Sequence, residues 1–469
     1  MKNVLVIGAG PGGYVAAIRS AQLGASVTVV EKENVGGTCL NVGCIPTKCL
    51  LHTAALKEEL VSRGKVIGVV ADNVSVDLSQ AMAHKDAVVA QLTGGVASLL
   101  KANGCEVIKG TASFTGPKTV NVVKVDGTSV EFTPDAVIIA AGSVNAAPPV
   151  PGIADNDDCI DSTGALSLKE IPETLAVIGA GVIGLEIGCA YAAFGTKVTI
   201  VEMLTDVMPK MDRDIIRAGV AHMKRMGIEF NMGAKVTAVE KKDGKNIVKF
   251  IASNGSEKEV SADKVLVATG RRAFTKDLGL DKAGIDCDRG AIIVDDHMRT
   301  NAPGIYAIGD CVKGYPQLAH TASVMGETAA ENIMGEDVRF DPVTNPSCLY
   351  IFPEAAAVGL TEEDCKAQGI EYHVGKFPLA ANGKALIEND GEGFVKLIIG
   401  NQYGEVLGMH VIGARASDII AEGSLAIGTE ATVDEIIGTI HSHPTVAEAV
   451  REAALASYGR AIHIQNRKK

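Results

Sequence analysis

A glycine-rich pattern occurs twice in this chain of 469 residues and constrains its fold more than any other feature. The first copy passes from an apolar stretch at 4–7 through three spaced glycines into a helical stretch at 14–23. A second apolar stretch follows at 26–30 and ends in an acid. The second copy has the same order, and in both the acid comes 23 residues after the first glycine. The residues are Gly8, Gly10, Gly13 and Glu31 in the first copy, and Gly179, Gly181, Gly184 and Glu202 in the second.

Strand, glycine turn, helix, strand and terminal acid are the parts of a βαβ unit that binds a dinucleotide. The glycines allow the backbone to approach a pyrophosphate, and the helix N-terminus supplies N–H donors and a positive dipole end. The acid accepts hydrogen bonds from ribose hydroxyls. Glu202 further favours NAD over NADP, because a carboxylate repels a 2′-phosphate and residues 203–206 supply no arginine.

Further strands are predicted between and after the two copies. Segments 136–142 and 264–270 each run from an apolar stretch to a glycine and could close the sheets of the two βαβ units. Alternating stretches at 235–241 and 246–253 are typical of strands. Asp310 ends a short apolar strand, a place suited to binding a sugar hydroxyl.

Two cysteines, Cys39 and Cys44, follow the first copy closely within a glycine-rich segment. Thiols in this place would lie beside the ring of a bound nucleotide, which favours a redox disulfide next to a flavin. Zinc is disfavoured, because structural zinc sites use two close cysteine pairs and no second pair accompanies this one. A buried, inert pair is the other alternative. No metal site is predicted.

Length and charge bound the class of protein. A chain this long should divide into about three domains, because single cores rarely exceed roughly 250 to 300 residues. The net charge of −12 opposes binding to nucleic acid or to an anionic membrane surface. Ten scattered cysteines suggest a reducing compartment. With no stretch long enough to span a membrane, we expect a cytoplasmic protein, or a mitochondrial-matrix protein if a transit peptide was removed.

After about residue 345 the pattern changes to an antiparallel sheet, with strands expected at 349–358, 394–399 and 406–412 and helices at 416–428 and 446–458. This region holds His441, His443 and Glu448. An imidazole can accept a thiol proton, and a carboxylate on its other nitrogen fixes the tautomer. The alternatives for His443 are a turn residue, a packed side chain, or a metal ligand together with His441.

With these residues identified, the chain resembles the pyridine nucleotide–disulfide oxidoreductases over essentially its full length. The motifs that carry the resemblance are GGTCLNVGCIPTK at 36–48, ATGRR at 268–272, IYAIGD at 305–310, LAH at 318–320, YIFPEAAAVGLTEE at 350–363 and HPTVAE at 443–448. The resemblance implies an α/β fold with two Rossmann-like dinucleotide-binding domains and a C-terminal α+β dimerisation domain. The implied segments are 1–145 and 271–345 for FAD, 146–270 for NAD and 346–469 for the subunit interface.

The resemblance also implies the cofactors and the residues that hold them. FAD would be held by Gly8, Gly10, Gly13, Glu31, Lys48, Ala112, Gly142, Ser143, Asp310 and Ala319. NAD would be held by Gly179, Gly181, Gly184, Glu186, Glu202, Val236 and Gly270. Lys48 and Glu186 would pair at the reactive edge of the flavin, where a cation stabilises the reduced ring.

In the implied reaction Cys39 exchanges with substrate, Cys44 faces the flavin, and His443 is the acid/base oriented by Glu448. The histidine would reach the cysteines of the other subunit, so a homodimer is implied. The motifs are most similar to those of members that oxidise protein-bound dihydrolipoamide, so the expected partner is a lipoylated acyltransferase or the glycine cleavage H protein. A reductase of glutathione disulfide, a mercuric reductase and a flavin-bearing scaffold without catalysis are the rivals. Residues 462–469 lack the cysteine pair that a mercuric reductase would carry there.

Overall fold

The chain forms two compact units, each made of three segments. The computed structural model describes residues 1–208, 211–388 and 390–466, so the last three residues of the segment 462–469 lie outside the described part. The first unit comprises Met1–Cys49, Gln80–Ala146 and Gly270–Pro342. The second comprises Leu50–Ser79, Ala147–Thr269 and Val343–Lys469.

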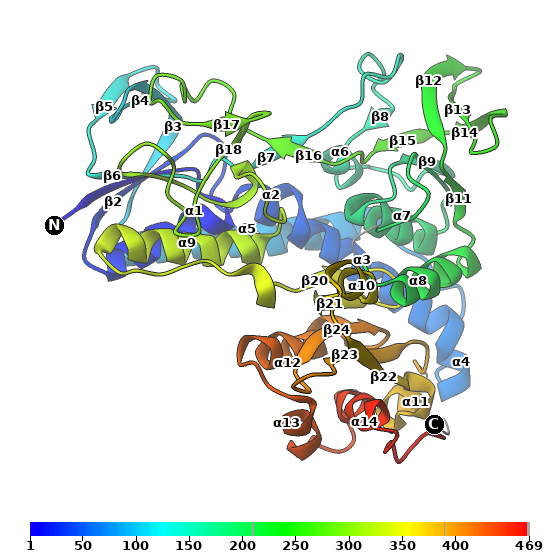
Figure 1. The fold of residues 1–469 in the computed structure, drawn as a ribbon. Helices are drawn as coiled ribbons and strands as arrows, with labels where there is room; N and C mark the ends of the chain where they lie inside the picture. Colours follow the sequence, from blue (N-terminus) through cyan, green and yellow to red (C-terminus); the bar gives the residue numbers. More distant parts are fainter. Residues whose placement is uncertain (209–210, 389, 467–469) are drawn as a thin grey trace. The chain divides into compact units, whose positions relative to one another are not determined.

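The first unit is built on a mixed sheet whose strands lie in the order β19-β6-β1-β2-β3-β4-β5 (Figure 1). The strands from β19 to β3 are parallel, and β3, β4 and β5 form an antiparallel meander. Helix α9 packs alongside helix α1, as Figure 1 shows. The bounds are β1 Asn3–Ile7, β2 Ser26–Glu31, β3 Glu106–Gly116, β4 Thr119–Lys124, β5 Ser129–Phe132, β6 Ala136–Ile139, β19 Ile305–Ala307, α1 Pro11–Gln22, α2 Gly37–Val42, α3 Cys44–Glu58, α5 Leu78–Ala102 and α9 Ala319–Met334. Helices α3 and α5 each cross from one unit into the other.

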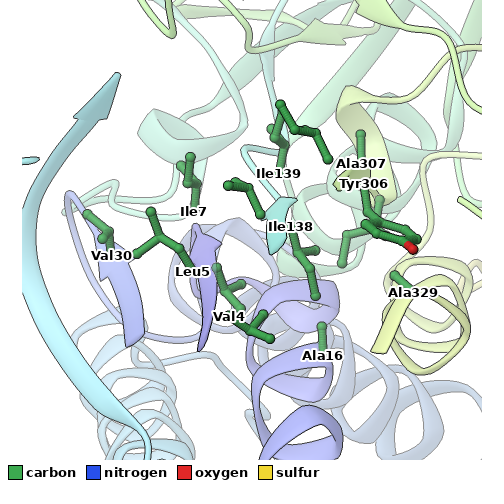
Figure 2. Close-up of a cluster of buried hydrophobic side chains, with 14 of the residues drawn as sticks. Val4, Leu5, Ile7, Ala16, Val30, Ile138, Ile139, Tyr306, Ala307 and Ala329 are labelled. Carbon is green, nitrogen blue, oxygen red and sulfur yellow. The ribbon is translucent and has the colours of Figure 1, made fainter. Parts of the chain in front are cut away.

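The core of this unit explains why its first strand is continuously apolar. All four residues from Val4 to Ile7 are at most 5% exposed, because parallel strands in the middle of a sheet are covered on both faces. Figure 2 shows Val4 and Ile138, from adjacent strands, facing Ala16 of α1. Helices α1 and α9 approach closely, since a Cβ on Gly326 would lie 2.6 Å from the Gly12 carbonyl oxygen.

The second unit contains three sheets. A parallel sheet has the order β11-β10-β9-β15-β8, an antiparallel sheet the order β12-β13-β14, and a C-terminal antiparallel sheet the order β20-β21-β24-β23-β22. The bounds are β8 Cys159–Ile160, β9 Thr174–Ile178, β10 Lys197–Glu202, β11 Glu229–Met232, β12 Lys235–Lys242, β13 Lys245–Ile251, β14 Glu257–Ala262, β15 Lys264–Val267, β20 Ser347–Leu349, β21 Ala355–Gly359, β22 Tyr372–Pro378, β23 Phe394–Gly400 and β24 Val406–Ile412. Its main helices are α7 Val182–Phe194, α8 Arg213–Arg225, α10 Glu362–Gln368, α12 Ala416–Gly428, α13 Val433–Gly438 and α14 Glu448–Ser457.

Most expected elements are present. The segments ending at Gly142 and Gly270 supply β6 and β15, which join the sheets of the two βαβ units beside β1 and β9. The single strand expected at 349–358 is wrong: β20 and β21 pair with each other, with residues 350–354 between them. Pro353 lacks the N–H that a continuous strand would use. Helix α8 was not expected, although Asp212 caps it by accepting from the Asp214 N–H. None of the described helices could span a membrane.

A buried lysine joins helices α8 and α10 to the C-terminal sheet within the second unit. The side chain of Lys396 on β23 is 2% exposed. Its ammonium donates to both carboxylate oxygens of Asp212, at 2.9 and 2.8 Å, and to Glu362 Oε1 at 2.6 Å. The same Lys396 Nζ lies 3.3 Å from Asp214 Oδ2. For Glu362, burial acts to raise the pKa, but hydrogen bonds from Lys396 and Tyr372 outweigh it and lower that pKa.

We predict that Lys396→Met lowers the free energy of unfolding by about 3–5 kcal/mol near pH 7, because it leaves the buried Asp212 carboxylate without its lysine partner and removes the nearest cation from Glu362. A carboxylate with a lowered pKa stabilises the fold above its ordinary pKa and loses that effect as the pH falls. The difference between wild type and variant should therefore shrink towards pH 4. Urea unfolding at both pH values measures it.

The matched control is Lys376→Met. Lys376 contacts the same Asp214 at 3.0 Å but has a side chain 43% exposed, so we expect a loss of at most about 1 kcal/mol. Equal losses from the two variants would contradict the assignment of the buried network.

Candidate active site

The first glycine turn is shaped by close backbone contacts. Gly8 has φ +104°, and a Cβ there would lie 2.3 Å from the Ala140 carbonyl oxygen. A Cβ on Gly13 would lie 1.9 Å from the Gly8 oxygen, which allows α1 to pack tightly against the turn. At Gly10 the nearest atom to such a Cβ would be 3.9 Å away. The turn is therefore closed beneath Gly8 and Gly13 and open at Gly10, where α1 begins with no described side chain capping it.

The terminal acid of this turn is held by backbone amides. Glu31 is 9% exposed; its Oε2 accepts from the Ala9 N–H at 2.7 Å and its Oε1 from the Glu33 N–H at 2.7 Å. The carboxylate is thus fixed at the end of β2 beside the turn. Each of its oxygens keeps a further lone pair for a sugar hydroxyl.

The second turn, in the second unit, repeats this geometry. A Cβ on Gly179 (φ +107°) would lie 2.4 Å from the Ala268 oxygen, and one on Gly184 would lie 2.2 Å from the Gly179 oxygen. No described atom lies within 4 Å of the corresponding position at Gly181. Glu202 accepts from the Ala180 and Leu204 N–H groups at 2.6 and 2.7 Å. Both turns thus have the form of a dinucleotide site.

The cysteine segment packs directly on the first turn. Gly36 and Gly37 have φ +94° and +55°, and a Cβ on Gly37 would lie 2.7 Å from Gly10 Cα. The Gly36 N–H donates to the Ala9 oxygen at 2.8 Å. Helix α2, which carries Cys39, begins at Gly37, and Cys44 is the first residue of α3. The two thiols are therefore anchored to the backbone that would hold the first nucleotide.

The two thiols interact with each other. A hydrogen bond with Cys44 raises the pKa of Cys39, burial and the charge of an ionised Cys44 raise it further, and the Lys48 ammonium opposes the shift. In the reduced pair the Cys39 thiol therefore stays protonated to a higher pH than an ordinary cysteine. Cys39 is partly buried and Cys44 is exposed. Such a pair can form a disulfide by thiol–disulfide exchange.

The other residues expected around the first nucleotide lie in the same unit. The Ser143 hydroxyl donates to Asp310 Oδ2 at 2.5 Å. Gly142 has φ +70° with no described atom within 4 Å of its Cβ position. Ala319 is the first residue of α9, whose N-terminus no described side chain caps. Ala112 is a buried residue of β3.

Among the residues expected around the second nucleotide, Glu186 is the most constrained. It is 2% exposed on α7, and its Oε1 accepts from the Tyr350 N–H at 3.0 Å, so it is not a solvated helix residue. Val236 is half-buried on β12, and Gly270 has φ +109° with open space around it. Lys48 lies in the first unit and Glu186 in the second, and their pairing stays a prediction.

The C-terminal domain presents an exposed histidine that is held by a partly buried glutamate. His443 Nδ1 lies 2.9 Å from Glu448 Oε1, and Glu448 Oε2 accepts from the Thr445 N–H at 2.9 Å. Burial acts to raise the pKa of Glu448, but these hydrogen bonds outweigh it and lower that pKa. The His443 side chain is 78% exposed, so Nε2 is free to meet another group. The pair has the geometry of an oriented acid/base.

His441 is a different kind of residue from His443. Its side chain is 7% exposed, with Nε2 2.9 Å from Glu422 Oε1 and Nδ1 3.2 Å from the Thr439 oxygen. The hydrogen bond with Glu422 raises its pKa. Both nitrogens are engaged, which argues against a metal site shared with His443. Elsewhere, Asp295, Asp296 and His297 cluster, but the His297 nitrogens already bond Asp296 and Asp337, at 2.7 and 2.9 Å, as in a salt-bridged turn.

Comparison with known proteins identifies the class. The model of the pyridine nucleotide-disulphide oxidoreductase family matches residues 2–326, and that of the family's dimerisation domain matches residues 345–454. The chain belongs to this family and is an oxidoreductase.

Individual relatives narrow the comparison. Dihydrolipoyl dehydrogenase of Geobacillus stearothermophilus is 45% identical over 98% of this chain and 97% of its own. The crystal structure of LpdA from Mycobacterium tuberculosis matches with a TM-score of 0.90 and 28% identity, covering 97% of this chain and 99% of its own. The HOCl-induced flavoprotein disulfide reductase RclA of Escherichia coli, as its Cu(II) complex, matches with a TM-score of 0.86 and 28% identity over 97% and 98% of the two chains.

We predict that Cys44→Ser lowers the pKa of Cys39 in the reduced protein. The substitution removes the Cys44 thiol, whose hydrogen bond acts most to raise that pKa, and with it the charge of an ionised Cys44; burial continues to act in the same direction. The rate of Cys39 alkylation by iodoacetamide should therefore rise at lower pH in the variant than in wild type, because the thiolate is the nucleophile.

Mass spectrometry of the peptide that contains Cys39, over a pH series, measures this. The control is Cys287→Ser, which removes an exposed thiol of the first unit that does not interact with the pair. Superimposable pH profiles for Cys39 in wild type and Cys44→Ser would contradict the thiol contact.

Proposed function

We propose that this protein is a dihydrolipoyl dehydrogenase that oxidises protein-bound dihydrolipoamide and reduces NAD⁺ through a Cys39–Cys44 disulfide and FAD. The observation that carries the proposal is the packing of the cysteine segment on the first glycine turn, with a second, equivalent turn for another nucleotide. The relatives named dihydrolipoyl dehydrogenase support the choice of substrate. The four-segment division at 145, 270 and 345 is part of the same proposal.

The first turn fits FAD. Open space at Gly10 and Gly142, uncapped N-termini of α1 and α9, and the fixed carboxylate of Glu31 are what a pyrophosphate and a ribose require. Lys48, Ala112, Ser143 and Asp310 would complete the site. When bound, FAD supplies an acceptor for the two electrons of the thiol pair and passes them on to NAD⁺.

The second turn fits NAD. Gly181 leaves space for the pyrophosphate, and the amides that hold Glu202 direct its carboxylate to the end of β10. That carboxylate would accept from the 2′-hydroxyl of the adenosine ribose. Glu186, Val236 and Gly270 would line the remainder of this site.

The thiol chemistry follows from the pair itself. One substrate thiolate attacks Cys39 Sγ, the Cys39–Cys44 bond breaks, and Cys44 leaves as a thiolate. The second substrate thiolate then attacks the first substrate sulfur, which is bonded to Cys39 in the mixed disulfide, and Cys39 is released as a thiolate. The substrate leaves as a cyclic disulfide and the protein holds two electrons as a reduced pair. His443 would accept the proton of one substrate thiol, with Glu448 stabilising the imidazolium, and would have to pass this proton to a released cysteine thiolate before it accepts the second.

The histidine would act on the cysteines of a second subunit. Its exposed side chain, the 95% exposed Ile440 beside it, and the match to a dimerisation domain support a homodimer in which this surface is covered. The partner that delivers the dithiol would be a lipoylated acyltransferase or the glycine cleavage H protein.

We predict that the purified protein is yellow and reduces NAD⁺ with dihydrolipoamide, and that it reduces glutathione disulfide with NADPH at least about 100-fold more slowly, since catalysis depends on selective transition-state binding. Absorbance at the NADH band measures the first reaction and loss of NADPH the second.

Cys44→Ser should lose the dihydrolipoamide reaction, and Cys287→Ser should keep it. A colourless protein that takes up no flavin, or a Cys44→Ser variant with the wild-type rate, would overturn the proposal.

The second turn predicts cofactor preference. Because a carboxylate binds the 2′-hydroxyl and repels a 2′-phosphate, we expect kcat/KM for NAD⁺ to exceed that for NADP⁺ by about 10- to 100-fold. Initial rates with each nucleotide at saturating dihydrolipoamide give the ratio. A preference for NADP⁺ would contradict the role of Glu202.

A further inference from the structure

Two short strands form a ladder at the borders of the first unit. β7 (Ser143–Asn145) pairs antiparallel with β16 (Arg271–Ala273), close to where the chain leaves this unit after Ala146 and returns at Gly270. The Ala146 N–H donates to the Gly270 oxygen at 3.0 Å, and the Phe274 N–H to the Gly142 oxygen at 2.9 Å. The ladder thus includes Gly142 and Ser143, both expected at the first nucleotide.

Arg271 is locked onto the opposite strand of this ladder. Its Nε donates to Ser143 Oγ at 2.7 Å, its Nη2 to the Ser143 carbonyl oxygen at 2.7 Å, and its Nη1 to Asn145 Oδ1 at 2.6 Å. Three donors of a planar, rigid group are satisfied at once, so the guanidinium has one orientation. ATGRR at 268–272 pointed to this residue, but the sequence assigned it no role.

The arginine determines where the Ser143 hydroxyl points. A hydroxyl has a single hydrogen, and because Arg271 Nε already donates to Oγ, that hydrogen is directed to Asp310 Oδ2, 2.5 Å away. Asp310 lies in the short 3-10 helix Gly309–Cys311 after β19. Within the described part of the chain, its other oxygen, Oδ1, has no hydrogen-bond donor. The carboxylate is therefore held by one oxygen and presents the other.

A second contact ties the ladder to the same site. Lys32 Nζ lies 4.0 Å from the centroid of the Phe274 ring, and Lys32 directly follows Glu31, the acid of the first turn. The ladder therefore contacts the expected nucleotide site at two points: through Ser143 to Asp310, and through Phe274 to the end of β2.

We propose that Arg271 is a positioning residue for FAD, which orients the Asp310 carboxylate through the Ser143 hydroxyl so that Oδ1 accepts from a hydroxyl of the cofactor. The proposal rests on the proposed function, since it requires FAD at the first turn. Arg271 touches neither FAD nor Asp310 in this arrangement, and its proposed role depends on the geometry of the guanidinium and not on its charge. A lysine keeps the charge but cannot donate to Ser143 Oγ, the Ser143 carbonyl oxygen and Asn145 Oδ1 together.

The test measures the rate of FAD release from the diluted holoprotein, followed by the rise of flavin fluorescence. Losing one well-placed hydrogen bond should speed release by about 3- to 10-fold, so we expect this for Arg271→Met, Arg271→Lys and Ser143→Ala. The double variant Arg271→Met/Ser143→Ala should release FAD no faster than the faster single variant, because both changes break the same relay, the hydrogen bonds from Arg271 through Ser143 to Asp310. Asp310→Asn should speed release at least about tenfold.

Arg272→Met is the matched control, because Arg272 is the exposed neighbour on the same strand, and its release rate should equal that of wild type. If Arg271 merely fastens the ladder, Arg271→Met will lower the thermal midpoint and leave FAD release unchanged, which overturns the proposal. Additive effects in the double variant overturn it too. If Arg271→Met does not fold, Arg271→Lys takes its place in the double variant with Ser143→Ala: effects on FAD release that do not add support the proposal, and additive effects overturn it.

The outcome also separates this proposal from the proposed function. A protein that never binds FAD refutes the proposed function. Release that is faster in Asp310→Asn but unchanged in Arg271→Met and Ser143→Ala leaves FAD at Asp310 and refutes the relay alone.

Discussion

The contact between two glycine backbones is the constraint on which the site depends. A Cβ on Gly37 would lie 2.7 Å from Gly10 Cα, so the cysteine segment and the first turn can lie together only with glycine at position 37. Helix α2, which carries Cys39, begins at this residue. The position of Cys39 relative to the first turn therefore depends on a close contact between two stretches of backbone.

The two turns share a backbone but differ in what surrounds them. In each turn the acid accepts from backbone amides at corresponding positions, and there is open space beside the middle glycine. The unit that holds the first turn also contains the cysteine segment, the aspartate of the 3-10 helix after β19, and helix α9, whose N-terminus no described side chain caps. Duplication of the βαβ unit would therefore account for the two proposed cofactors, and the residues added around the first copy would account for the proposed thiol chemistry.

The sequence predicted the parts of the fold that depend on local periodicity. The βαβ units, β6, β15, β23, β24 and α12 follow from apolar patterns and glycine turns within short windows. The division of 349–358 into two strands, helix α8 and the Lys396 cluster depend on partners far along the chain. The Lys396 and Asp212 pair spans 184 residues, and no spacing rule relates them. For the same reason the sequence could not predict the hydrogen-bonded link from Arg271 to Asp310 through Ser143.

The amide bonds to Glu202 bear on attempts to redesign this enzyme for a phosphorylated nicotinamide cofactor. In the proposed site this carboxylate would bind the ribose, and in the structure it already closes the turn by accepting from the Ala180 and Leu204 N–H groups. Exchanging it for a small neutral residue would deprive two main-chain donors of their acceptor, at a cost of about 1–3 kcal/mol for each one left buried. A successful design would have to rebuild the loop after β10 along with the charge.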